Sequence, residues 1–244
     1  MDETRALLLA AGRGTRLRPV TDQCPKCLVP IAGRPLLDYW FEALARAGIR
    51  DVLVNTHHLR DQVQGYLRGL APRFRVVESF EPSLLGSAGT IHAHSDWLDG
   101  ARDGLIVYAD NLSNVDLPAL LRFHRSHPDP ITMAVFRTPH PSECGIVGLD
   151  DEGRVIEFVE KPARPASDLA NAGLYVASRA GWREIAEADA FDLGFDVLPR
   201  FVGRMRAFLH GGYHLDIRDP GALDQARVEA PGVFGATGGA RRGA

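Results

Sequence analysis

The sequence predicts an α/β fold: a doubly wound central sheet, mostly parallel or mixed, with helices on both faces and a β-rich second half. Two observations carry the prediction. Short apolar runs alternate with segments of helical spacing along the first half of the chain, which is typical of a sheet built from β-α-β units. The first apolar run is followed by a loop with two closely spaced glycines, as expected where a strand ends at the ligand-binding edge of such a sheet.

The elements of the first half follow from hydrophobic periodicity and from the residues that interrupt it. The apolar run at 5–9 stops before Gly12, and the helical pattern at 36–47 stops at Gly48, a common residue at a helix C-terminus. The expected strands of this half are 5–9, 51–55, 75–77, 104–109 and 131–136, and the expected helices are 36–47, 58–67, 86–93 and 117–127.

The second half of the sequence predicts strands that pair antiparallel. Residues 145–149 and 154–159 flank the turn sequence Asp150-Asp-Glu-Gly153, which predicts a β-hairpin. A strand at 172–177, a helix at 181–188 and a short strand at 213–217 are also expected. Beyond Glu229 the sequence is mainly Pro, Gly, Ala and Arg, so we expect one folded domain over residues 1–228 and a disordered tail over residues 229–244.

The composition excludes several classes of partner. Hydrophobic residues make up 45% and charged residues 24% of the 244 residues, the mixture of an ordinary globular domain that can bury a full core. A formal net charge of −3 predicts neither a nucleic-acid partner nor a membrane surface. No apolar run approaches the ~20 residues that a membrane-spanning helix needs. The first five residues show no signal-peptide pattern, so the expected compartment is the cytoplasm.

Three cysteines are too few for a disulfide framework. Cys24 and Cys27 have the C-x-x-C spacing of a metal or redox site, but no second pair of ligands stands at a suitable spacing. We therefore expect both to be structural residues beside Lys26. The same interpretation applies to two histidine pairs, His57-His58 and His92-x-His94.

The loop after the first strand has the chemistry of an anion site. Gly12 and Gly14 allow close approach of the backbone, so that successive N–H groups can face a phosphate. The sequence is not a P-loop, because no Gly-Lys pair occurs, and it lacks the third glycine of the dinucleotide fingerprint. Fixed positive charge comes from Arg13, Arg16, Arg18 and Lys26.

The run Leu9-Ala-Ala-Gly-Arg-Gly-Thr-Arg-Leu-Arg-Pro19, followed by Thr21 and Pro25-Lys26-x-Leu28, resembles the signature of the sugar-nucleotide pyrophosphorylases, the NDP-sugar nucleotidyltransferases. The resemblance implies a Rossmann-like fold of GT-A type, in which residues 1–115 bind the NTP and residues 116–228 bind the sugar phosphate. It assigns catalytic roles to Arg16, which steadies the triphosphate, and Lys26, which contacts phosphate near the reacting phosphorus. The implied nucleotide-binding residues are Leu9, Ala11, Gly12, Gly14, Thr15, Arg16, Gly86 and Ser87.

The resemblance also implies a magnesium site. Asp110 ends a buried strand, and Asp216 lies in a short apolar strand far along the chain; both fall where the family carries metal-binding aspartates. A hard divalent cation commonly combines one or two carboxylates with substrate phosphates. Three positions depart from the family pattern: Ala109 stands before Asp110 in place of glycine, His214 in place of tryptophan, and Arg218 in place of glycine.

The segments that the resemblance assigns to the sugar lie further along the chain. Val159-Glu160-Lys161-Pro162 is similar to the family's Glu-Lys-Pro element, in which the lysine binds the sugar phosphate and the acid binds a sugar hydroxyl. The loop 81–90 is similar to the segment that holds the base and the sugar. The implied residues for binding the sugar phosphate are Asn111, Gly145, Glu160, Lys161 and Asn171.

The implied function is that of a magnesium-dependent enzyme that transfers a nucleoside monophosphate from an NTP, GTP being favoured, to a sugar 1-phosphate. The short chain and Leu85-Gly-Ser-Ala-Gly89 look most like guanylyltransferases for mannose- or heptose-type 1-phosphates. Uridylyl or thymidylyl transfer to a hexose or cyclitol 1-phosphate stays open, as does a catalytically silent sugar-nucleotide sensor. A related glycosyltransferase would carry an Asp-x-Asp motif, which the segment at Asp110 lacks. A homo-oligomer is neither required nor excluded.

Overall fold

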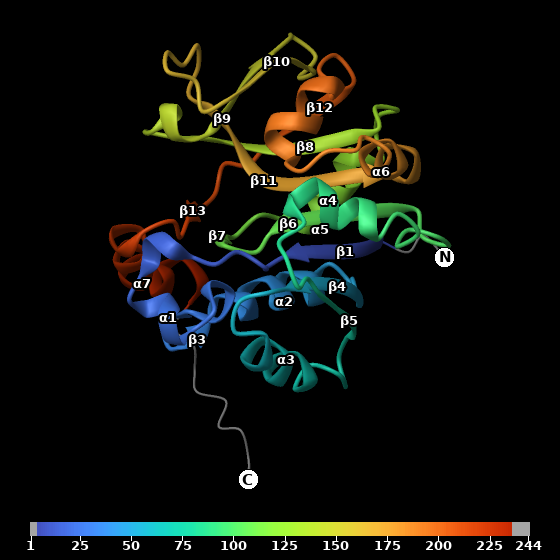
Figure 1. Cartoon of the computed structure of the whole chain (residues 1–244). Coiled ribbons are helices and arrows are strands. Elements are labelled where there is room, and N and C mark those ends of the chain that lie inside the picture. The colour runs from blue at the N-terminus through green and yellow to red at the C-terminus, as the bar shows by residue number, and fades with distance from the viewer. Residues whose placement is uncertain (1–3, 236–244) are drawn as a thin grey trace.

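Figure 1 shows the computed structural model of the chain, which describes residues 4–235 as a twisted sheet with helices packed on both faces. Within these residues the main sheet has nine strands. Seven follow in the order β10-β9-β11-β6-β1-β4-β5, and β8 and β12 branch from β11. The predicted doubly wound α/β class with a mixed sheet is confirmed.

The first half of the chain forms the parallel part of the sheet. Strand β1 lies between β4 and β6, and its Ala6 is in register with Val52 on one side and Leu105 on the other. Because these strands are parallel, their carboxyl ends meet at one edge of the sheet. The parallel strands of this part are β1 (Thr4–Leu9), β4 (Asp51–Thr56), β5 (Arg75–Phe80) and β6 (Asp103–Tyr108).

The second half forms the mostly antiparallel part. The long strand β11 joins the two parts, because it pairs antiparallel with β6 and also with β8 and β9. The predicted hairpin is present as β9 and β10. The strands of this part are β8 (Ile131–Arg137), β9 (Gly145–Leu149), β10 (Val155–Glu160), β11 (Leu169–Ser178) and β12 (Met205–Leu209), the last of which the sequence did not predict.

Two hydrophobic cores lie on opposite faces of the sheet. Neighbouring residues of a strand point to opposite faces, so Leu8 and Leu7 of β1 enter different cores. The core that contains Leu8 is covered by α2 (Leu36–Arg46), α3 (Arg60–Arg68) and α5 (Leu117–His124). The core that contains Leu7 is covered by α4 (Gly86–Ala93) and α6 (Arg179–Ala186).

A third core joins segments from near the two ends of the described chain. In this core α7 (Pro220–Phe234) packs against residues 17–39, as the neighbouring labels α7, α1 and β3 in Figure 1 show. The small strands nearby are β2 (Pro30–Ile31) with β3 (Arg34–Pro35), and β7 (Asn111–Ser113) with β13 (His214–Asp216). The short helices are α1 (Val20–Gln23), η1 (Thr15–Leu17), η2 (Lys26–Leu28), η3 (Pro141–Glu143), η4 (Leu193–Val197) and η5 (Leu198–Phe201).

The expected start of a disordered tail at residue 229 is wrong. Helix α7 continues to Phe234 although Pro231 lies inside it. Packing explains the continuation, because Ala226 and Ala230 are buried and the ring of Phe234 meets that of Tyr39 edge-on at 4.8 Å between centroids. Residues 236–244 of the expected tail lie outside the described residues, as do residues 1–3.

Within the described part of the chain, no helix is both long enough and apolar enough to cross a bilayer.

Candidate functional site

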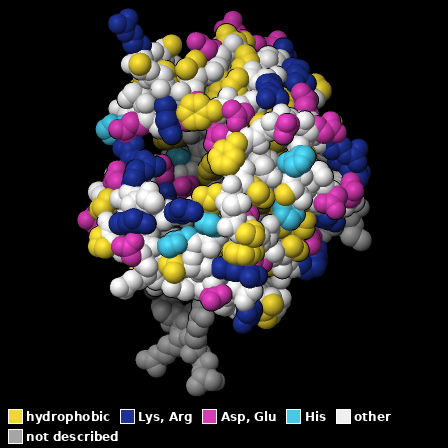
Figure 2. Space-filling view, viewed as in Figure 1, with side chains coloured by type: hydrophobic (Ala, Val, Ile, Leu, Met, Phe, Trp, Pro, Cys, Tyr) yellow, Lys and Arg dark blue, Asp and Glu magenta, His cyan; other side chains and the backbone are white. Residues whose placement is uncertain are grey.

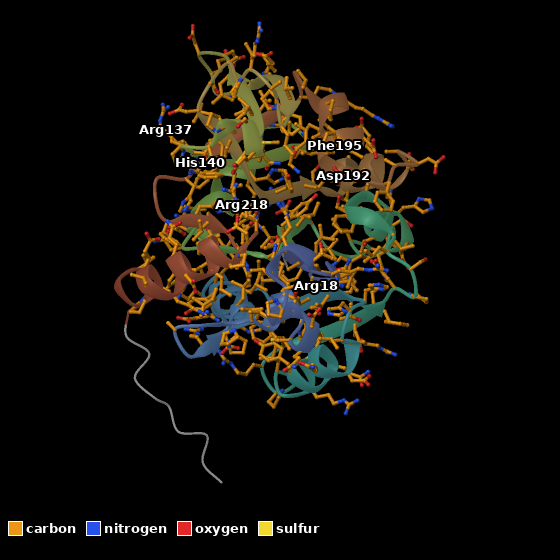
Figure 3. All side chains as sticks on the ribbon, turned by 60° about the vertical axis from the view of Figure 1, so that its left-hand side comes forward. Arg18, Arg137, His140, Asp192, Phe195 and Arg218 are labelled. Carbon is orange, nitrogen blue, oxygen red and sulfur yellow. The ribbon has the colours of Figure 1, made fainter. Side chains whose placement is uncertain are left out.

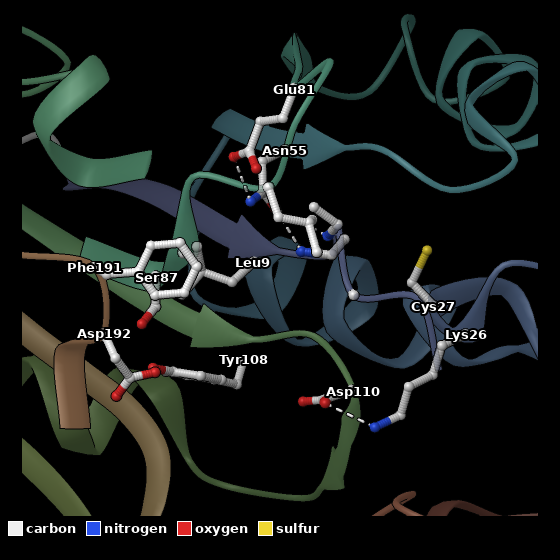
Figure 4. A pocket seen from close by; sticks show the side chains of 15 residues that line it. Leu9, Lys26, Cys27, Asn55, Glu81, Ser87, Tyr108, Asp110, Phe191 and Asp192 are labelled. Carbon is white, nitrogen blue, oxygen red and sulfur yellow. Dashed lines mark hydrogen bonds and ion pairs between the residues drawn. The ribbon is translucent and has the colours of Figure 1, made fainter. Parts of the chain in front are cut away.

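A cavity opens where the parallel strands end. We call it the N-terminal cavity; its volume is about 260 Å³ (Figure 4). The ends of β1, β4, β5 and β6 contribute Leu9, Asn55, Glu81 and Tyr108, and helix α4 closes one side. Its lining comprises Leu9, Ala10, Ala11, Gly12, Lys26, Cys27, Asn55, Glu81, Leu84, Gly86, Ser87, Tyr108, Asp110, Phe191 and Asp192.

A buried polar network holds one wall of the N-terminal cavity. The Asn55 Nδ2 donates to Glu81 Oε1 at 2.9 Å and to the Thr90 Oγ1 at 3.1 Å, and the Thr90 hydroxyl donates to Glu81 Oε1 at 2.6 Å. All three residues are at most 4% exposed. The Asn55 Oδ1 accepts from the backbone N–H groups of Ala10 and Ala11 at 2.6 and 3.2 Å. The network therefore fixes the beginning of the glycine-containing loop against two neighbouring strands and α4.

The N-terminus of α4 lies close to a segment from the second half of the chain. Gly86 has a left-handed backbone (φ 79°), and a Cβ there would overlap with the carbonyl oxygen of Phe191. The Ser87 hydroxyl does not cap the helix; it accepts a hydrogen bond from the N–H of Leu193 at 2.8 Å. Phe191 and Asp192 thus form one side of the N-terminal cavity, although the sequence analysis assigned them to the other half of the domain.

A second cavity lies between the antiparallel strands and the ends of β6 and β13. We call it the C-terminal cavity; its volume is about 250 Å³. In the space-filling view the molecule is hollowed on its left-hand side, and Lys and Arg side chains gather along the rim of the hollow (Figure 2). The lining comprises Arg16, Tyr108, Asp110, Asn111, Phe136, Glu143, Cys144, Gly145, Glu160, Lys161, Asn171, Ala172, Gly173, Tyr175, Asp192, Gly194, Phe195, His214 and Asp216.

Two glycines make room for the carboxylate of Glu160 in the C-terminal cavity. A Cβ at Gly145 would come within 2.5 Å of Glu160 Oε2, and one at Gly194 within 3.1 Å. Burial raises the pKa of Glu160, while the ammonium group of Lys161, 4.0 Å away, opposes the rise. Lys161 itself has a left-handed backbone (φ 49°), which is uncommon for a residue with a Cβ. The carboxylate is thus held inside the cavity with only partial charge compensation.

The two cavities meet at a cluster of opposite charges. Pairing of β7 with β13 sets Asn111 opposite Asp216, and so brings Asp216 beside Asp110. The Lys26 Nζ lies 2.7 Å from Asp110 Oδ2 and 3.6 Å from Asp216 Oδ1. Burial alone would lower the pKa of Lys26, but the two carboxylates outweigh burial and raise it. Burial and the charge of Asp110 raise the pKa of Asp216 to about 6.

The carboxylates of Asp110 and Asp216 are suited to a divalent cation. They lie close enough for the charge of Asp110 to raise the pKa of Asp216, and a cation between them would remove this repulsion. Among residues 4–235 no group of three or more His, Cys, Asp or Glu is placed to hold a metal ion. A cation bound here would take its other ligands from water or from substrate oxygens, as hard divalent cations commonly do.

A third cavity continues outward from the C-terminal cavity. We call it the outer cavity; its volume is about 400 Å³. It receives a basic side chain from the N-terminal loop, another from the end of β10 and a third from the segment before α7. Its lining comprises Arg16, Ser142, Glu143, Lys161, Asp216, Arg218 and Asp219.

The structure places most of the predicted site residues along these cavities. Leu9, Ala11, Gly12, Gly86 and Ser87 line the N-terminal cavity. All five residues that the resemblance assigned to the sugar phosphate line the C-terminal cavity: Asn111, Gly145, Glu160, Lys161 and Asn171.

Three predicted nucleotide-binding residues lie elsewhere. Arg16 lines the C-terminal and outer cavities, on the far side of the charge cluster from the N-terminal cavity. Gly14 and Thr15 line none of the three described cavities. Gly14 instead stabilises the turn of the loop. Its backbone is left-handed (φ 61°), and its carbonyl oxygen accepts a hydrogen bond from the Thr21 hydroxyl at 2.7 Å.

Asn55, Tyr108, Phe191 and Asp192 are among the lining residues that the sequence did not predict. A signal existed for Asn55, because a polar residue at the end of a buried parallel strand lies at the ligand edge. Phe191 and Asp192 stand in a loop without a recognisable spacing.

The cysteine and histidine pairs make other contacts. Burial raises the pKa of the Cys27 thiol to about 12 and raises that of Cys24, so both stay protonated at neutral pH. The rings of His57 and His58 bond to the carbonyl oxygens of Glu81 and Thr21, each within 2.8 Å. The rings of His92 and His94 bond to the Ala186 carbonyl oxygen and the Ser79 hydroxyl, each at 2.7 Å.

The departure from the family pattern at His214 falls inside the C-terminal cavity. Its ring packs on Phe136 with 4.3 Å between centroids. Burial lowers the pKa of His214 to about 3, so the imidazole is neutral. Its Nδ1 is buried without a hydrogen-bond partner in the described part of the chain.

Comparisons with known proteins agree with this geometry. Residues 5–206 match the family described as nucleotidyl transferase. The UTP–glucose-1-phosphate uridylyltransferase of Synechocystis is 31% identical over 214 residues, and the mannose-1-phosphate guanylyltransferase of Mycobacterium tuberculosis is 32% identical over 237 residues. These matches cover 81% and 93% of this chain but 55% and 66% of those proteins. The chain thus spans between about half and two thirds of the length of these relatives.

A solved structure from Bacillus anthracis, named as a glucose-1-phosphate thymidylyltransferase and determined in complex with sucrose, has the same fold. It superposes with a TM-score of 0.83 over 96% of both chains at 20% sequence identity. The likeness of the structures extends over nearly the whole chain, and the family match runs from β1 into β12. By its sequence and its fold, this chain belongs to the nucleotidyl transferase family.

Proposed function

We propose that this chain transfers a nucleoside monophosphate from an NTP to a sugar 1-phosphate and releases pyrophosphate, with Mg²⁺ bound by Asp110 and Asp216. One observation carries the proposal: two cavities of similar volume meet at a cluster of two carboxylates and a lysine. A reaction that joins two phosphate-bearing substrates needs such an arrangement, with one compartment for each substrate and the charge-neutralising groups between them.

The N-terminal cavity is suited to the base and ribose of the NTP. Its apolar side chains, Leu9, Leu84 and Phe191, offer surfaces for a flat ring. Gly12 leaves open space where any other residue would carry a Cβ, and apart from its two chain neighbours no described residue has an atom within 4 Å of that position. The network around Asn55 fixes the backbone that leads to the phosphates. Little reorganisation is then needed when the NTP binds.

The C-terminal cavity is suited to the sugar. Its lining is rich in groups that bond to hydroxyls, among them Asn111, Glu160 and Asn171. Lys161 follows Glu160 directly and supplies a positive charge for the phosphate of the sugar 1-phosphate. These assignments follow the resemblance of residues 159–162 to the Glu-Lys-Pro element.

For this reaction the protein has to position the two substrates and neutralise the negative charge of their phosphates. An oxygen of the sugar phosphate attacks the α-phosphorus of the NTP, and the bond from that phosphorus to the pyrophosphate oxygen breaks. The attacking oxygen needs no general base, because a phosphate monoester has its second pKa near 6. Lys26 lies within the charge cluster and Arg16 lines the cavities beside it, where the negative charge of both substrates gathers. Bound Mg²⁺ would neutralise phosphate charge and align the reacting groups.

Guanylyl transfer is the favoured form of the reaction. Support comes from the loop Leu85-Gly-Ser-Ala-Gly89 and from the names of relatives such as the Mycobacterium tuberculosis protein. Uridylyl transfer is the second candidate, since the Synechocystis relative with nearly equal identity carries that name. Base preference is therefore a separate outcome of the same assay.

Pyrophosphate release tests the proposal. The protein is incubated with Mg²⁺, each of four NTPs and a panel of sugar 1-phosphates that includes mannose 1-phosphate and glucose 1-phosphate. We expect release that requires one NTP and one sugar phosphate and that stops when EDTA is added. Nucleotide binding without release across the panel would contradict the proposal and favour a sugar-nucleotide sensor. The clustering of Lys26, Asp110 and Asp216 argues against a sensor, which has no need of them.

A further inference from the structure

The outer cavity belongs to the same side of the molecule as the C-terminal cavity. None of its seven lining residues lines the N-terminal cavity. Four of them, Arg16, Glu143, Lys161 and Asp216, also line the C-terminal cavity. An anionic group carried by a molecule in the C-terminal cavity can therefore reach the outer cavity without crossing the N-terminal one.

Arg218 enters the outer cavity from a well-anchored backbone. The N–H of the preceding Ile217 donates to the carbonyl oxygen of Asp110 at 3.1 Å. The following Asp219 begins α7, where its Oδ1 accepts from the N–H of Ala222 at 2.9 Å. Figure 3 places Arg218 near the middle of the view, below Arg137 and His140 and above the N-terminal segment with Arg18. The guanidinium group thus extends from a fixed position between the two parts of the molecule.

The present partners of Arg218 are exchangeable. Its guanidinium forms an ion pair with Glu143 of η3 and a longer one with Asp219, at 3.3 Å. The side chains of these two acids are 47% and 44% exposed. Ion pairs at such exposure contribute little, because water and salt screen them. A dianion that enters the cavity can compete with Glu143 for the guanidinium at small cost.

The outer cavity offers a phosphate three cations. Arg16 forms no ion pair within the described residues, and the nearest acid to the Lys161 ammonium is Glu160 at 4.0 Å. Arg218 adds a planar fork that binds two oxygens of one phosphate group, which a lysine cannot do.

We propose that Arg218 is a phosphate-binding residue: it leaves Glu143 and grips the phosphate group of the sugar 1-phosphate. The inference rests on the proposed function. The same chemistry could serve pyrophosphate, but the continuity of the outer and C-terminal cavities favours the sugar phosphate. In the absence of substrate, the carboxylate of Glu143 takes the place of the phosphate and holds the guanidinium of Arg218 in position.

Two variants give opposite predictions. Arg218→Ala removes the guanidinium group. The KM for mannose 1-phosphate, measured in the forward reaction with GTP and Mg²⁺, should then rise about tenfold, which is the effect of losing one hydrogen bond to a charged group. Arg218→Lys should rescue part of this loss. Glu143→Gln removes the competitor and a negative charge, so the same KM should fall about two- to threefold. Arg137→Ala is the matched control, because Arg137 is also an ion-paired surface arginine but lines none of the three cavities.

Other outcomes overturn the proposal. If the Arg218–Glu143 pair is only structural, both variants break it and raise the KM alike. If Arg218→Ala raises the KM for pyrophosphate in the reverse reaction but not that for the sugar phosphate, the assignment to the sugar is wrong. If the wild type shows no turnover, the proposed function fails, and titration calorimetry with mannose 1-phosphate then tests the phosphate site by itself. Equal affinity of wild type and Arg218→Ala for mannose 1-phosphate would overturn the assignment of Arg218 as well.

Discussion

The N-terminal and C-terminal cavities are nearly equal in volume but are built in different ways. In the first, the buried polar groups bond to one another: Asn55 of β4 alone takes part in four hydrogen bonds, which reach α4 and the segments that directly follow β1 and β5. In the second, polar groups remain available. Among residues 4–235, His214 has a buried nitrogen without a hydrogen-bond partner, and Glu160 has its nearest positive charge 4.0 Å away.

This difference in the pairing of polar groups affects how each cavity selects its ligand. A cavity whose polar groups are already paired presents one fixed surface to its ligand. A cavity with unpaired groups obtains their partners only from the ligand, so a wrong ligand leaves them unsatisfied at a cost of about 1–3 kcal/mol each. We infer that selectivity for the acceptor resides in the C-terminal cavity, where the departure at His214 also lies.

The largest effect is expected at the charge cluster that the two cavities share. Lys26→Ala should lower turnover about 10²-fold or more, because a preorganised positive charge next to the reacting phosphates is lost. Asp110→Ala should do the same. The measurement is pyrophosphate release at saturating concentrations of both substrates, with Arg18→Ala as the control, since Arg18 forms only an exposed ion pair with Asp22. Near-normal turnover in Lys26→Ala would remove its assigned role.

The contrast between the cavities is tested by a pair of asparagine variants. Asn55→Ala removes one of the hydrogen bonds to buried Glu81 and leaves the backbone N–H groups of Ala10 and Ala11 without their acceptor, so the free energy of unfolding should fall by about 3 kcal/mol. Asn111→Ala removes one side-chain hydrogen bond, to the carbonyl oxygen of Ala172, and should cost about 1 kcal/mol. Urea unfolding measures both. Equal losses would mean that the N-terminal cavity is no more preorganised than the C-terminal one.

The sequence was most informative where physical patterns are local. The alternation of strands and helices predicted the sheet, and the glycines and arginines of residues 9–19 predicted an anion site at a strand end. The pairing of Asp110 with Asp216 came only from the family resemblance, because the contact depends on β7 and β13, two three-residue strands far apart in the chain. Such short strands carry almost no periodicity of their own.

Other features required the tertiary structure. The network of Asn55, Glu81 and Thr90 joins single polar residues that have no common spacing. The helix 58–67 was expected two residues too early, because Leu59 has a left-handed backbone (φ 50°) and α3 starts at Arg60. The end of α7 depends on packing against Tyr39, which outweighs the low helix propensity of Pro231 and Gly232.

A smaller effect is expected for Glu160 of the C-terminal cavity, and it tests whether the polar groups of this cavity contribute to stability. Burial raises the pKa of Glu160, so its charge is not fully compensated in the folded protein. Glu160→Gln should therefore change the free energy of unfolding by less than about 1 kcal/mol, while the KM for the sugar 1-phosphate rises about tenfold. Thermal unfolding and initial rates provide the two readouts. A strong loss of stability would show that this cavity, too, depends on its own polar groups.

The smallest effect concerns His124, which lines neither cavity. A variant at this position distinguishes the acid sensitivity of the fold from that of the site. Burial lowers the pKa of His124 to about 4, even though Asp103 opposes the change. Unfolded His124 takes up a proton near pH 6.5, whereas the folded protein does so only near pH 4. The unfolded state therefore binds more protons between these values, and stability falls as the pH is lowered.

Between pH 6.5 and 5.5 this one group should lower the free energy of unfolding by about 1 kcal/mol. Urea unfolding at the two pH values measures the change, and His124→Gln should reduce it, because glutamine does not titrate. His127, Asp103 and Arg125 surround the same ring and are left unchanged in the variant. An identical pH dependence in wild type and His124→Gln would assign the acid sensitivity to other groups, including those of the charge cluster between the two cavities.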